Sequence, residues 1–252
     1  MKQNSMHGKR SRMAVGREVA RIVAHGAVEL DIDLPESAAA AFEIYYDYLK
    51  LYSQRVNLTA IEGVENIARL HFLDSLALLR ATAFTNLRVI DVGSGAGFPG
   101  VPLKIAEPTI DLTLLDAKGK RVSFLSGLCA VLTINAACVH ARAEEASQRP
   151  DMRECYDVAL SRAVARLNVL CELCIPFVCV GGVFLSMKSV DSDDEIADAR
   201  SAIAILGAEL VEAWDYTIPG TEIKHRVIVI RKTSITPDVY PRRFAKIQNM
   251  PL

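Results

Sequence analysis

The second half of the chain alternates between short β-branched runs and helical patterns, and this alternation excludes most fold classes. The runs cover residues 88–92, 112–116, 137–141, 156–161, 183–188, 209–217 and 226–231. Helical segments separate the first six runs, which is typical of βαβ units whose parallel sheet is covered on both faces. Only residues 218–224 join the sixth run to the seventh, and so short a connection cannot cross over. We therefore predict an α/β fold with a seven-stranded, mostly parallel sheet and an antiparallel last strand.

Three helical patterns precede the sheet. Apolar residues recur at helical spacing over residues 13–25, 35–52 and 67–79. We predict a small N-terminal helical layer over residues 13–84 and a domain over residues 85–252 that contains the sheet and a basic C-terminal tail. We expect residues 1–12 to form an unfolded basic arm.

The charges are distributed unevenly. The 252 residues contain 29 Lys and Arg against 30 Asp and Glu, which gives a net charge of −1. Residues 1–21 nevertheless carry +5 and residues 224–252 carry +6, so the part between them carries −12. Basic ends on an acidic body raise the question of a polyanionic partner, although solvated tails would give the same pattern.

The composition and the apolar segments narrow the class of protein. A hydrophobic content of 51% with 23% charged residues is ordinary for a soluble globular protein. The most apolar stretch, residues 169–187, contains Glu172 and Pro176, so we expect no membrane span. The N-terminus lacks the apolar stretch of a secretory signal, which favours the cytoplasm. Cys171 and Cys174 form a C-x-x-C without a second ligand pair, so we expect no metal site and reduced cysteines.

A glycine-rich segment follows the first run directly and opens a helix. A dinucleotide fingerprint would need a glycine where Phe98 stands, which argues against an NAD-dependent oxidoreductase. The pattern acid-x-Gly-x-Gly-x-Gly of methyltransferases is complete, with Asp91, Gly93, Gly95 and Gly97. A carboxylate here would attract the cationic S-adenosylmethionine and repel phosphates. We therefore predict a Rossmann-like S-adenosylmethionine-dependent methyltransferase fold with S-adenosylmethionine as cofactor; a purely structural glycine turn is the alternative.

Two further segments lie where such a cofactor would extend. Asp116 ends the second run, at the sheet edge where an acid can accept both ribose hydroxyls. The alternative role for Asp116 is to cap the helix that starts near Lys118. The segment Arg142-Ala143-Glu144-Glu145 follows the third run and is placed to face the adenine, with Glu145 expected to face solvent.

Six motifs, in order along the chain, resemble the bacterial 16S rRNA guanine-N7 methyltransferase family, also called the glucose-inhibited division protein B family. They are Asn57-Leu58-Thr59-Ala60, residues 71–75, residues 91–100, residues 114–125, Ser161-Arg162-Ala163 and Thr236-Pro237-x-x-Tyr240-Pro241-Arg242. The resemblance extends from about Tyr45 to the C-terminus. It implies methyl transfer from S-adenosylmethionine to N7 of one guanine in a 16S rRNA loop near the decoding centre. It also implies that the donor is bound by Gly93, Phe98, Ala143, Glu144 and Arg162.

The chemistry of guanine N7 bears on the role of Arg162. N7 carries a free lone pair, so its methylation needs no general base. Arg162 is expected to position the cofactor or to contact guanine O6 alone, because a bidentate contact to O6 and N7 would block the atom that is methylated. An ion pair with Asp91 or Asp116 is the alternative for Arg162. His71 is expected to be a capping or core residue of the helical layer.

Basic residues near the predicted site suggest that the binding partner is a nucleic acid. We expect 16S rRNA or the small ribosomal subunit to bind through phosphate contacts of Lys118, Lys120, Arg121, Lys188, Arg242 and Arg243. The protein is expected to act as a monomer. A small-molecule or protein methyltransferase on the same fold, and a non-catalytic nucleotide- or RNA-binding protein, are the competing hypotheses.

Overall fold

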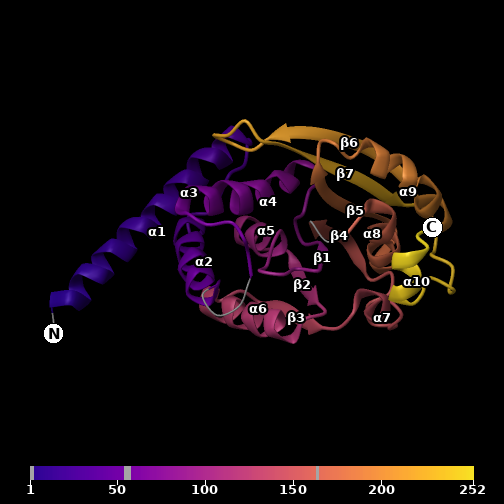
Figure 1. Ribbon diagram of the computed structural model, residues 1–252, viewed down its shortest axis with the longest axis horizontal. Coiled ribbons are helices and arrows are strands. Elements are labelled where there is room, and N and C mark those ends of the chain that lie inside the picture. Colours follow the sequence, from indigo (N-terminus) through magenta and orange to yellow (C-terminus); the bar gives the residue numbers. More distant parts are fainter. Residues whose placement is uncertain (1–2, 54–57, 163–164) are drawn as a thin grey trace.

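A seven-stranded sheet forms the centre of the molecule (Figure 1). The computed structural model describes residues 3–53, 58–162 and 165–252, and for residues 3–15 it describes the backbone. The spatial order of the strands is β3-β2-β1-β4-β5-β7-β6. Their bounds are β1 Arg88–Val92, β2 Asp111–Asp116, β3 Ala136–His140, β4 Tyr156–Arg162, β5 Val178–Ser189, β6 Ala208–Thr217 and β7 Lys224–Lys232.

The strand directions confirm the predicted sheet. Neighbouring strands from β1 to β5 pair in parallel, whereas β7 pairs antiparallel with both β5 and β6. The hairpin of β6 and β7 therefore closes the sheet as expected. Its inner member is β7, so the last strand in the chain lies between the two strands that precede it.

Helices cover the two faces of the sheet in two groups, which flank the strands in Figure 1. On one face lie α1 Gln3–Glu29, α2 Ala38–Ser53, α3 Val64–Ile67, the π-helix η1 Ala68–Leu73, α4 Asp74–Leu76, the 3₁₀-helix η2 Ala77–Arg80, α5 Gly100–Ala106 and α6 Gly119–Leu132. On the other lie α7 Ala143–Ala146, α8 Leu167–Cys174, the 3₁₀-helix η3 Ile175–Phe177, α9 Asp193–Ile205 and α10 Phe244–Asn249.

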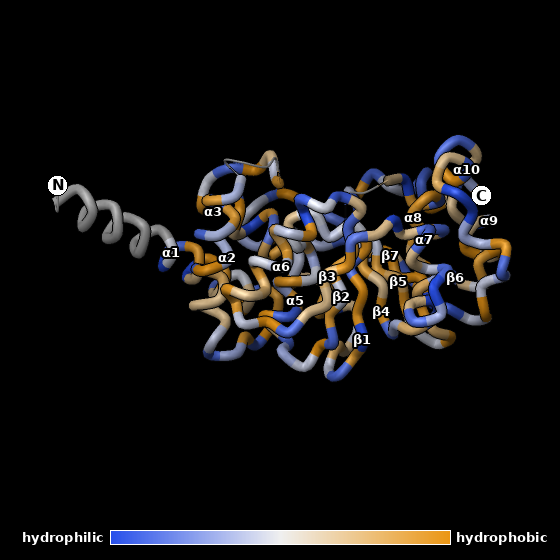
Figure 2. The backbone as a smooth tube through the Cα atoms, turned by 90° about the horizontal axis from the view of Figure 1, so that it is seen from below, coloured by the Kyte–Doolittle hydropathy of each residue, from blue (hydrophilic) through white to orange (hydrophobic). Residues whose placement is uncertain are grey.

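The apolar core is divided by the sheet. Successive strand residues point to opposite faces, so Val89 belongs to one buried cluster and Ile90 to the other. The cluster around Val89 also contains Phe42 of α2 and Phe72 of η1. The N-terminal helices are thus packed directly on the sheet. Figure 2 shows segments of hydrophobic residues, in orange, along the backbone of this region.

The structure corrects the expectation for the N-terminus. Helix α1 begins at Gln3, so residues 3–12 are helical and do not form an unfolded arm, while residues 1–2 lie outside the described part of the chain. The segment has no proline, and its Lys, Arg and Met residues favour helix, so the backbone hydrogen bonds of α1 extend into it. Among the described residues, none of the helices combines the length and the apolar character that crossing a membrane requires.

Candidate functional site

The glycine-rich segment forms a tight loop between β1 and α5. Gly93, Gly95 and Gly97 all have positive φ, at 78°, 58° and 95°, a conformation that costs glycine little. A Cβ atom added at Gly97 would lie 2.7 Å from the Tyr45 hydroxyl. That hydroxyl donates a hydrogen bond of 2.6 Å to the carbonyl of Ala96. Helix α2 of the N-terminal layer therefore holds the loop in place.

Asp91 lies beneath this loop and is fully buried. Its Oδ2 atom accepts a hydrogen bond of 2.9 Å from the Gly100 backbone N–H, and its Oδ1 atom has no hydrogen-bond partner among the described residues. Burial raises the pKa of Asp91 to about 7, although the Gly100 hydrogen bond and the charge of Arg162 oppose the shift. Asp91 thus holds the start of α5 through Oδ2 and leaves Oδ1 without a protein partner among the described residues.

Asp116 connects the glycine loop to the start of α6. Its Oδ2 atom accepts hydrogen bonds from the Gly95 N–H at 3.0 Å and from Arg121 at 3.3 Å, and its Oδ1 atom accepts one from the Lys118 N–H at 2.8 Å. The Lys118 contact lies just before α6, whose N-cap residue is Lys118 and whose first turn has no side-chain cap hydrogen bond. The residue is 3% exposed and lies at the carboxyl end of β2.

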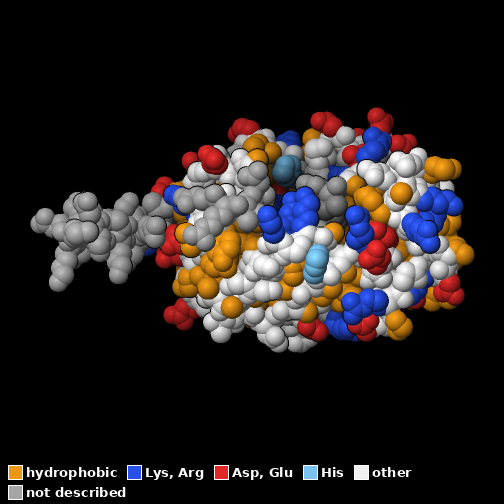
Figure 3. All heavy atoms as spheres, turned by 60° about the horizontal axis from the view of Figure 1, so that its bottom comes forward, with side chains coloured by type: hydrophobic (Ala, Val, Ile, Leu, Met, Phe, Trp, Pro, Cys, Tyr) orange, Lys and Arg blue, Asp and Glu red, His pale blue; other side chains and the backbone are white. Residues whose placement is uncertain are grey.

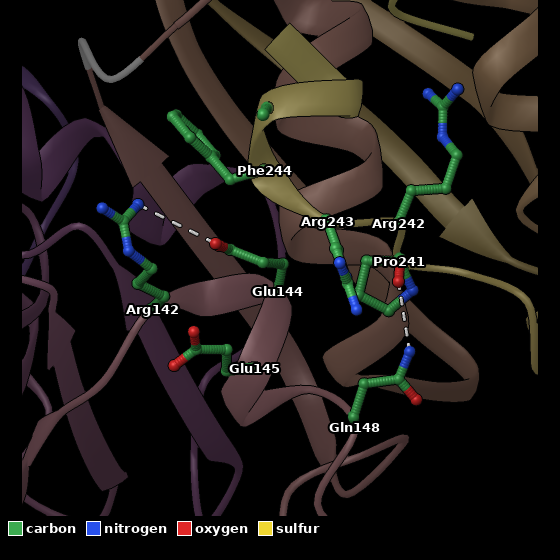
Figure 4. A pocket seen from close by; sticks show the side chains of 9 residues that line it. Arg142, Glu144, Glu145, Gln148, Pro241, Arg242, Arg243 and Phe244 are labelled. Atoms are coloured by element: carbon green, nitrogen blue, oxygen red, sulfur yellow. Dashed lines mark hydrogen bonds and ion pairs between the residues drawn. The ribbon is translucent and has the colours of Figure 1, made fainter.

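The segment after β3 lines a cavity of about 730 Å³ (Figure 4). Glu144 is buried and lies 3.8 Å from the Arg142 guanidinium, which in turn lies over the Phe244 ring at 5.4 Å. Glu145 is exposed, as expected, although it also lines the cavity. The opposite wall is the C-terminal tail, residues 241–245, and Gln148 Nε2 donates a 3.1 Å hydrogen bond to the Pro241 carbonyl. The sequence associated this tail only with RNA.

The structure decides which carboxylate pairs with Arg162. Arg162 ends β4, and its Nη1 atom lies 3.0 Å from Asp74 Oδ2 and 3.2 Å from the Leu70 carbonyl. The partner is therefore Asp74, and not Asp91 or Asp116 as the alternative supposed. The reason is that the π-helix η1 and α4 pack against the sheet and carry Leu70 and Asp74 to the end of β4.

His71 has a more specific place than a general core residue. Its Nδ1 atom lies 2.9 Å from Arg162 Nη2, which can only donate, so Nδ1 is the acceptor and Nε2–H faces Thr59 Oγ1 at 2.7 Å. Burial, together with the charge of Arg162, lowers the pKa of His71 to about 3, so the ring is neutral. The ring stacks on Phe98 with centroids 4.4 Å apart, and Phe98 also stacks on Tyr45 at 5.2 Å.

Sequence reasoning missed the buried carboxylate at the centre of this cluster. Asp74 is 1% exposed and also accepts hydrogen bonds from the Tyr216 hydroxyl at 2.6 Å and from His225 Nδ1 at 2.7 Å. Although burial alone would raise it, the pKa of Asp74 is lowered by the His225 hydrogen bond and by the charge of Arg162. The same hydrogen bond raises the pKa of His225. A second cavity, of about 310 Å³, opens between His225, Arg162 and Asp74.

Comparisons with known proteins agree over most of the chain. The family model described as rRNA small subunit methyltransferase G matches residues 38–220. A protein named ribosomal RNA small subunit methyltransferase G from Alkaliphilus oremlandii is 45% identical over 237 residues, which are 93% of this chain and 99% of that protein. The chain belongs to the rRNA small subunit methyltransferase G family. A family member from Acetivibrio thermocellus is 42% identical over 93% of this chain and 97% of its own length.

Solved structures support the fold of this family member. A methyltransferase from Pyrococcus furiosus superimposes with a TM-score of 0.51 at 11% identity, over 76% of this chain and 97% of that protein. The YcgJ protein of Bacillus subtilis gives a TM-score of 0.50 at 12% identity, over 65% of this chain and all of its own. These likenesses show the Rossmann-like methyltransferase fold that the strand pattern predicted.

The basic residues predicted for this rRNA methyltransferase family member divide into two groups. Lys118, Lys120 and Arg243 are exposed, and Figure 3 shows Lys and Arg side chains over the middle of one face. Arg121, Lys188 and Arg242 instead contact carboxylates of the protein itself, namely Asp116, Glu195 and Glu172.

Arg242 has the most extensive contacts with a carboxylate among these residues. Its Nη2 and Nε atoms contact the Glu172 carboxylate at 2.6 and 2.8 Å, and Glu172 is fully buried. Arg242 therefore anchors the C-terminal tail to α8 through Nε and Nη2. Within two of the family motifs, Asn57 and Ala163 lie outside the described residues.

Proposed function

We propose that this protein transfers a methyl group from S-adenosylmethionine to N7 of a guanine in 16S rRNA. The observation that carries the proposal is the family match over residues 38–220, since this range contains the glycine loop, His71, Asp74 and Arg162. The loop lies at the carboxyl end of a parallel sheet, which is where ligands of such folds bind.

The residues around the loop suit a cationic donor. S-adenosylmethionine supplies an electrophilic methyl group on a positively charged sulfonium. Asp91 presents a buried oxygen without a hydrogen-bond partner among the described residues, and Asp116 and Glu144 add two more carboxyl groups. A Cβ atom added at Gly95 would meet nothing closer than 3.8 Å, so a ligand can approach this backbone.

We assign each predicted donor residue to one part of S-adenosylmethionine. Gly93, Gly95 and Gly97 present the loop backbone, and Asp116 offers its carboxylate to the ribose. Ala143 and Glu144, at the start of α7, are assigned to the adenine. Phe98 and Arg162 lie together, with the guanidinium 5.0 Å from the ring centre, and close the methionine end of the site.

Catalysis then depends on alignment. The N7 lone pair attacks the methyl carbon directly, so no side chain needs to remove a proton. His71 is consistent with this scheme, because both of its ring nitrogens already have protein partners. Orienting two reactants can supply about 7–11 kcal/mol of the barrier reduction. The protein's own contribution is to hold donor and acceptor in line.

The acceptor explains the exposed basic residues. Lys118 and Lys120 at the start of α6, with Arg243 beside α10, would neutralise rRNA phosphates. The substrate is 16S rRNA or the small subunit that contains it, and the enzyme acts where small subunits assemble, in the cytoplasm.

The proposal is tested in cells and with the purified protein. Deletion of its gene should abolish N7-methylguanosine in small-subunit rRNA, measured by nucleoside mass spectrometry, and purified protein should restore it to particles from the deletion strain. An unchanged modification level, with donor binding by calorimetry, would favour a small-molecule or protein methyltransferase. Donor binding without any turnover would favour a non-catalytic binding protein.

A further inference from the structure

We propose that the 310 Å³ cavity holds the acceptor base, and that His225 donates a hydrogen bond to guanine O6. This inference rests on the proposed function and deepens it, because it assigns the acceptor subsite and a residue that selects guanine. Neither the family match nor the glycine loop identifies such a residue.

The position of the cavity is the first argument. Its lining comes from the ends of β4 and β5, the beginning of β7 and the helices η1 and α4. Arg162 lines it and lies over Phe98 of the glycine loop, so the cavity adjoins the proposed donor site. Its volume is near the lower limit of small-molecule sites, roughly 300–1,000 Å³, which suits a single extruded base. Enzymes that modify a base take it out of the helical stack in this way.

The lining of the cavity also suits a purine. Ile61, Leu70 and Met187 supply apolar surface for the faces of the ring. The polar lining includes Arg162 and His225, which both contact Asp74, and also His71, Lys188 and Ser189. An apolar pocket with a few fixed polar groups is the usual composition of a specific ligand site.

The orientation of His225 is the second argument. Its Nδ1 atom is held 2.7 Å from Asp74 Oδ1, and Asp74 is itself fixed by Tyr216 and Arg162. In an imidazole ring Nε2 lies on the far side from Nδ1, so it faces away from buried Asp74. Nε2 has no hydrogen-bond partner among the described residues, and the side chain is 32% exposed. Protein contacts therefore fix one ring nitrogen and leave the other for a ligand.

The charges that face His225 come from four elements. Asp74 of α4 favours the imidazolium form, in which Nε2 is a donor, and the Tyr216 hydroxyl of β6 contacts the same carboxylate. The charge of Arg162 of β4 disfavours the imidazolium form of His225, and Lys188 of β5 lines the same cavity. The direct hydrogen bond to Asp74 is the larger influence and raises the pKa of His225.

Guanine is the base that such a donor selects. On the edge that carries N7, guanine presents the acceptor O6, whereas adenine presents the amino group N6 at the same place. A single donor to O6 leaves the N7 lone pair free for the methyl group. Arg162 cannot easily take this role, because Nη1 and Nη2 already contact Asp74, Leu70 and His71.

The test combines a change in the protein with a change in the base. His225→Ala and wild type are assayed on small subunits reconstituted with guanine or 2-aminopurine, which keeps N7 but lacks O6, at the methylated position. We expect His225→Ala to lower kcat/KM on guanine by about 10- to 100-fold, the range for a hydrogen bond to a charged donor. Wild type should lose kcat/KM when 2-aminopurine replaces guanine. His225→Ala should lose nothing more when the base is changed, because its hydrogen bond to O6 is already absent.

Control variants separate this role from folding. His225→Gln keeps an amide donor and should retain more activity than His225→Ala, and the exposed His25→Gln on α1 should match wild type. Donor affinity by calorimetry should stay within about twofold for every variant. The assignment of His225 would be overturned if the changes of His225 and of the base lowered kcat/KM additively. It would also be overturned if donor affinity fell as much as kcat/KM. If wild type does not methylate even the subunits that contain guanine, the proposed function itself is wrong.

Discussion

The buried Asp91 carboxyl sets a pH-dependent cost on folding. Its pKa in the folded protein is about 7, above the ordinary value of 3.8, so between these values the folded state binds a proton that the unfolded state releases. Stability therefore falls as pH rises from about 4 to about 7, and the full cost remains above that range. In the proposed function this cost is offset, because the Asp91 charge would attract the cationic donor.

Asp91→Asn tests this reasoning. The amide oxygen can still accept the Gly100 hydrogen bond, while the buried charge is lost. We expect the gain in melting temperature over wild type to be larger at about pH 8 than at about pH 5, and donor affinity by calorimetry to fall. A difference in melting temperature that is the same at both pH values would contradict the assigned cause.

Arg162 should affect the reaction more than the fold. In Arg162→Ala the buried Asp74 keeps its hydrogen bonds from Tyr216 and His225, so the protein should remain folded. We expect donor affinity or kcat/KM to fall by about 10- to 100-fold, because a charged hydrogen-bonding group next to Phe98 is removed. The exposed Arg166, paired with Asp198, is the matched control as Arg166→Ala. Unchanged calorimetry and turnover for Arg162→Ala would contradict its role.

The anchor between the C-terminal tail and α8 is a buried ion pair. Removing one partner of such a pair typically costs about 3–5 kcal/mol, because the other charge stays buried and unpaired. Arg242→Ala should therefore lower the free energy of unfolding, measured with urea, by an amount in this range. Adding Glu172→Leu to Arg242→Ala should recover part of the loss. A double variant that is less stable than Arg242→Ala would show that the pair is not what stabilises the tail.

The strands could be predicted because each apolar run is bounded by polar or turn residues. β1 begins and ends where the pattern of residues 88–92 placed it, and the other strands shifted by a few residues. The position of β7 inside the sheet could not be predicted, since its pairing with β5 joins segments far apart in the sequence. The start of α1 was missed because residues 3–12 lack the apolar periodicity that marks a packed helix.

The part of the candidate site that lies near the strand ends could be predicted with the strands. Asp91 and Asp116 lie at the carboxyl ends of β1 and β2, and Glu144 lies in α7 after β3. The carboxyl ends of parallel strands meet at one edge of the sheet. Asp74 and His225 come from α4 and β7, and only the packing of the helical layer on the sheet brings them together. The motif at residues 71–75 was the available signal, but it did not show which strand those residues would contact.

Binding to rRNA should reflect the uneven charge of the molecule. The exposed Lys118 and Lys120 lie at the start of α6, close to Asp116, which contacts Gly95 of the glycine loop. Each phosphate contact contributes roughly 0.7–0.9 to the slope of log affinity against log salt. We expect Lys118→Glu with Lys120→Glu to weaken binding to small subunits and to lower that slope, in filter binding at several salt concentrations. The exposed Arg200→Glu on α9 is the control. Equal slopes for the double variant and wild type would argue against these contacts.

The place of β7 between β5 and β6 has a consequence for synthesis of the chain. β6 is made before β7 but pairs only with β7, so it leaves the ribosome without a strand to join. Until residues 224–232 emerge, β5 presents an open edge that can pair with another chain. The tail that lines the larger cavity follows later still. A prematurely terminated chain would therefore be a substrate for chaperones and proteases, and not a partly active enzyme.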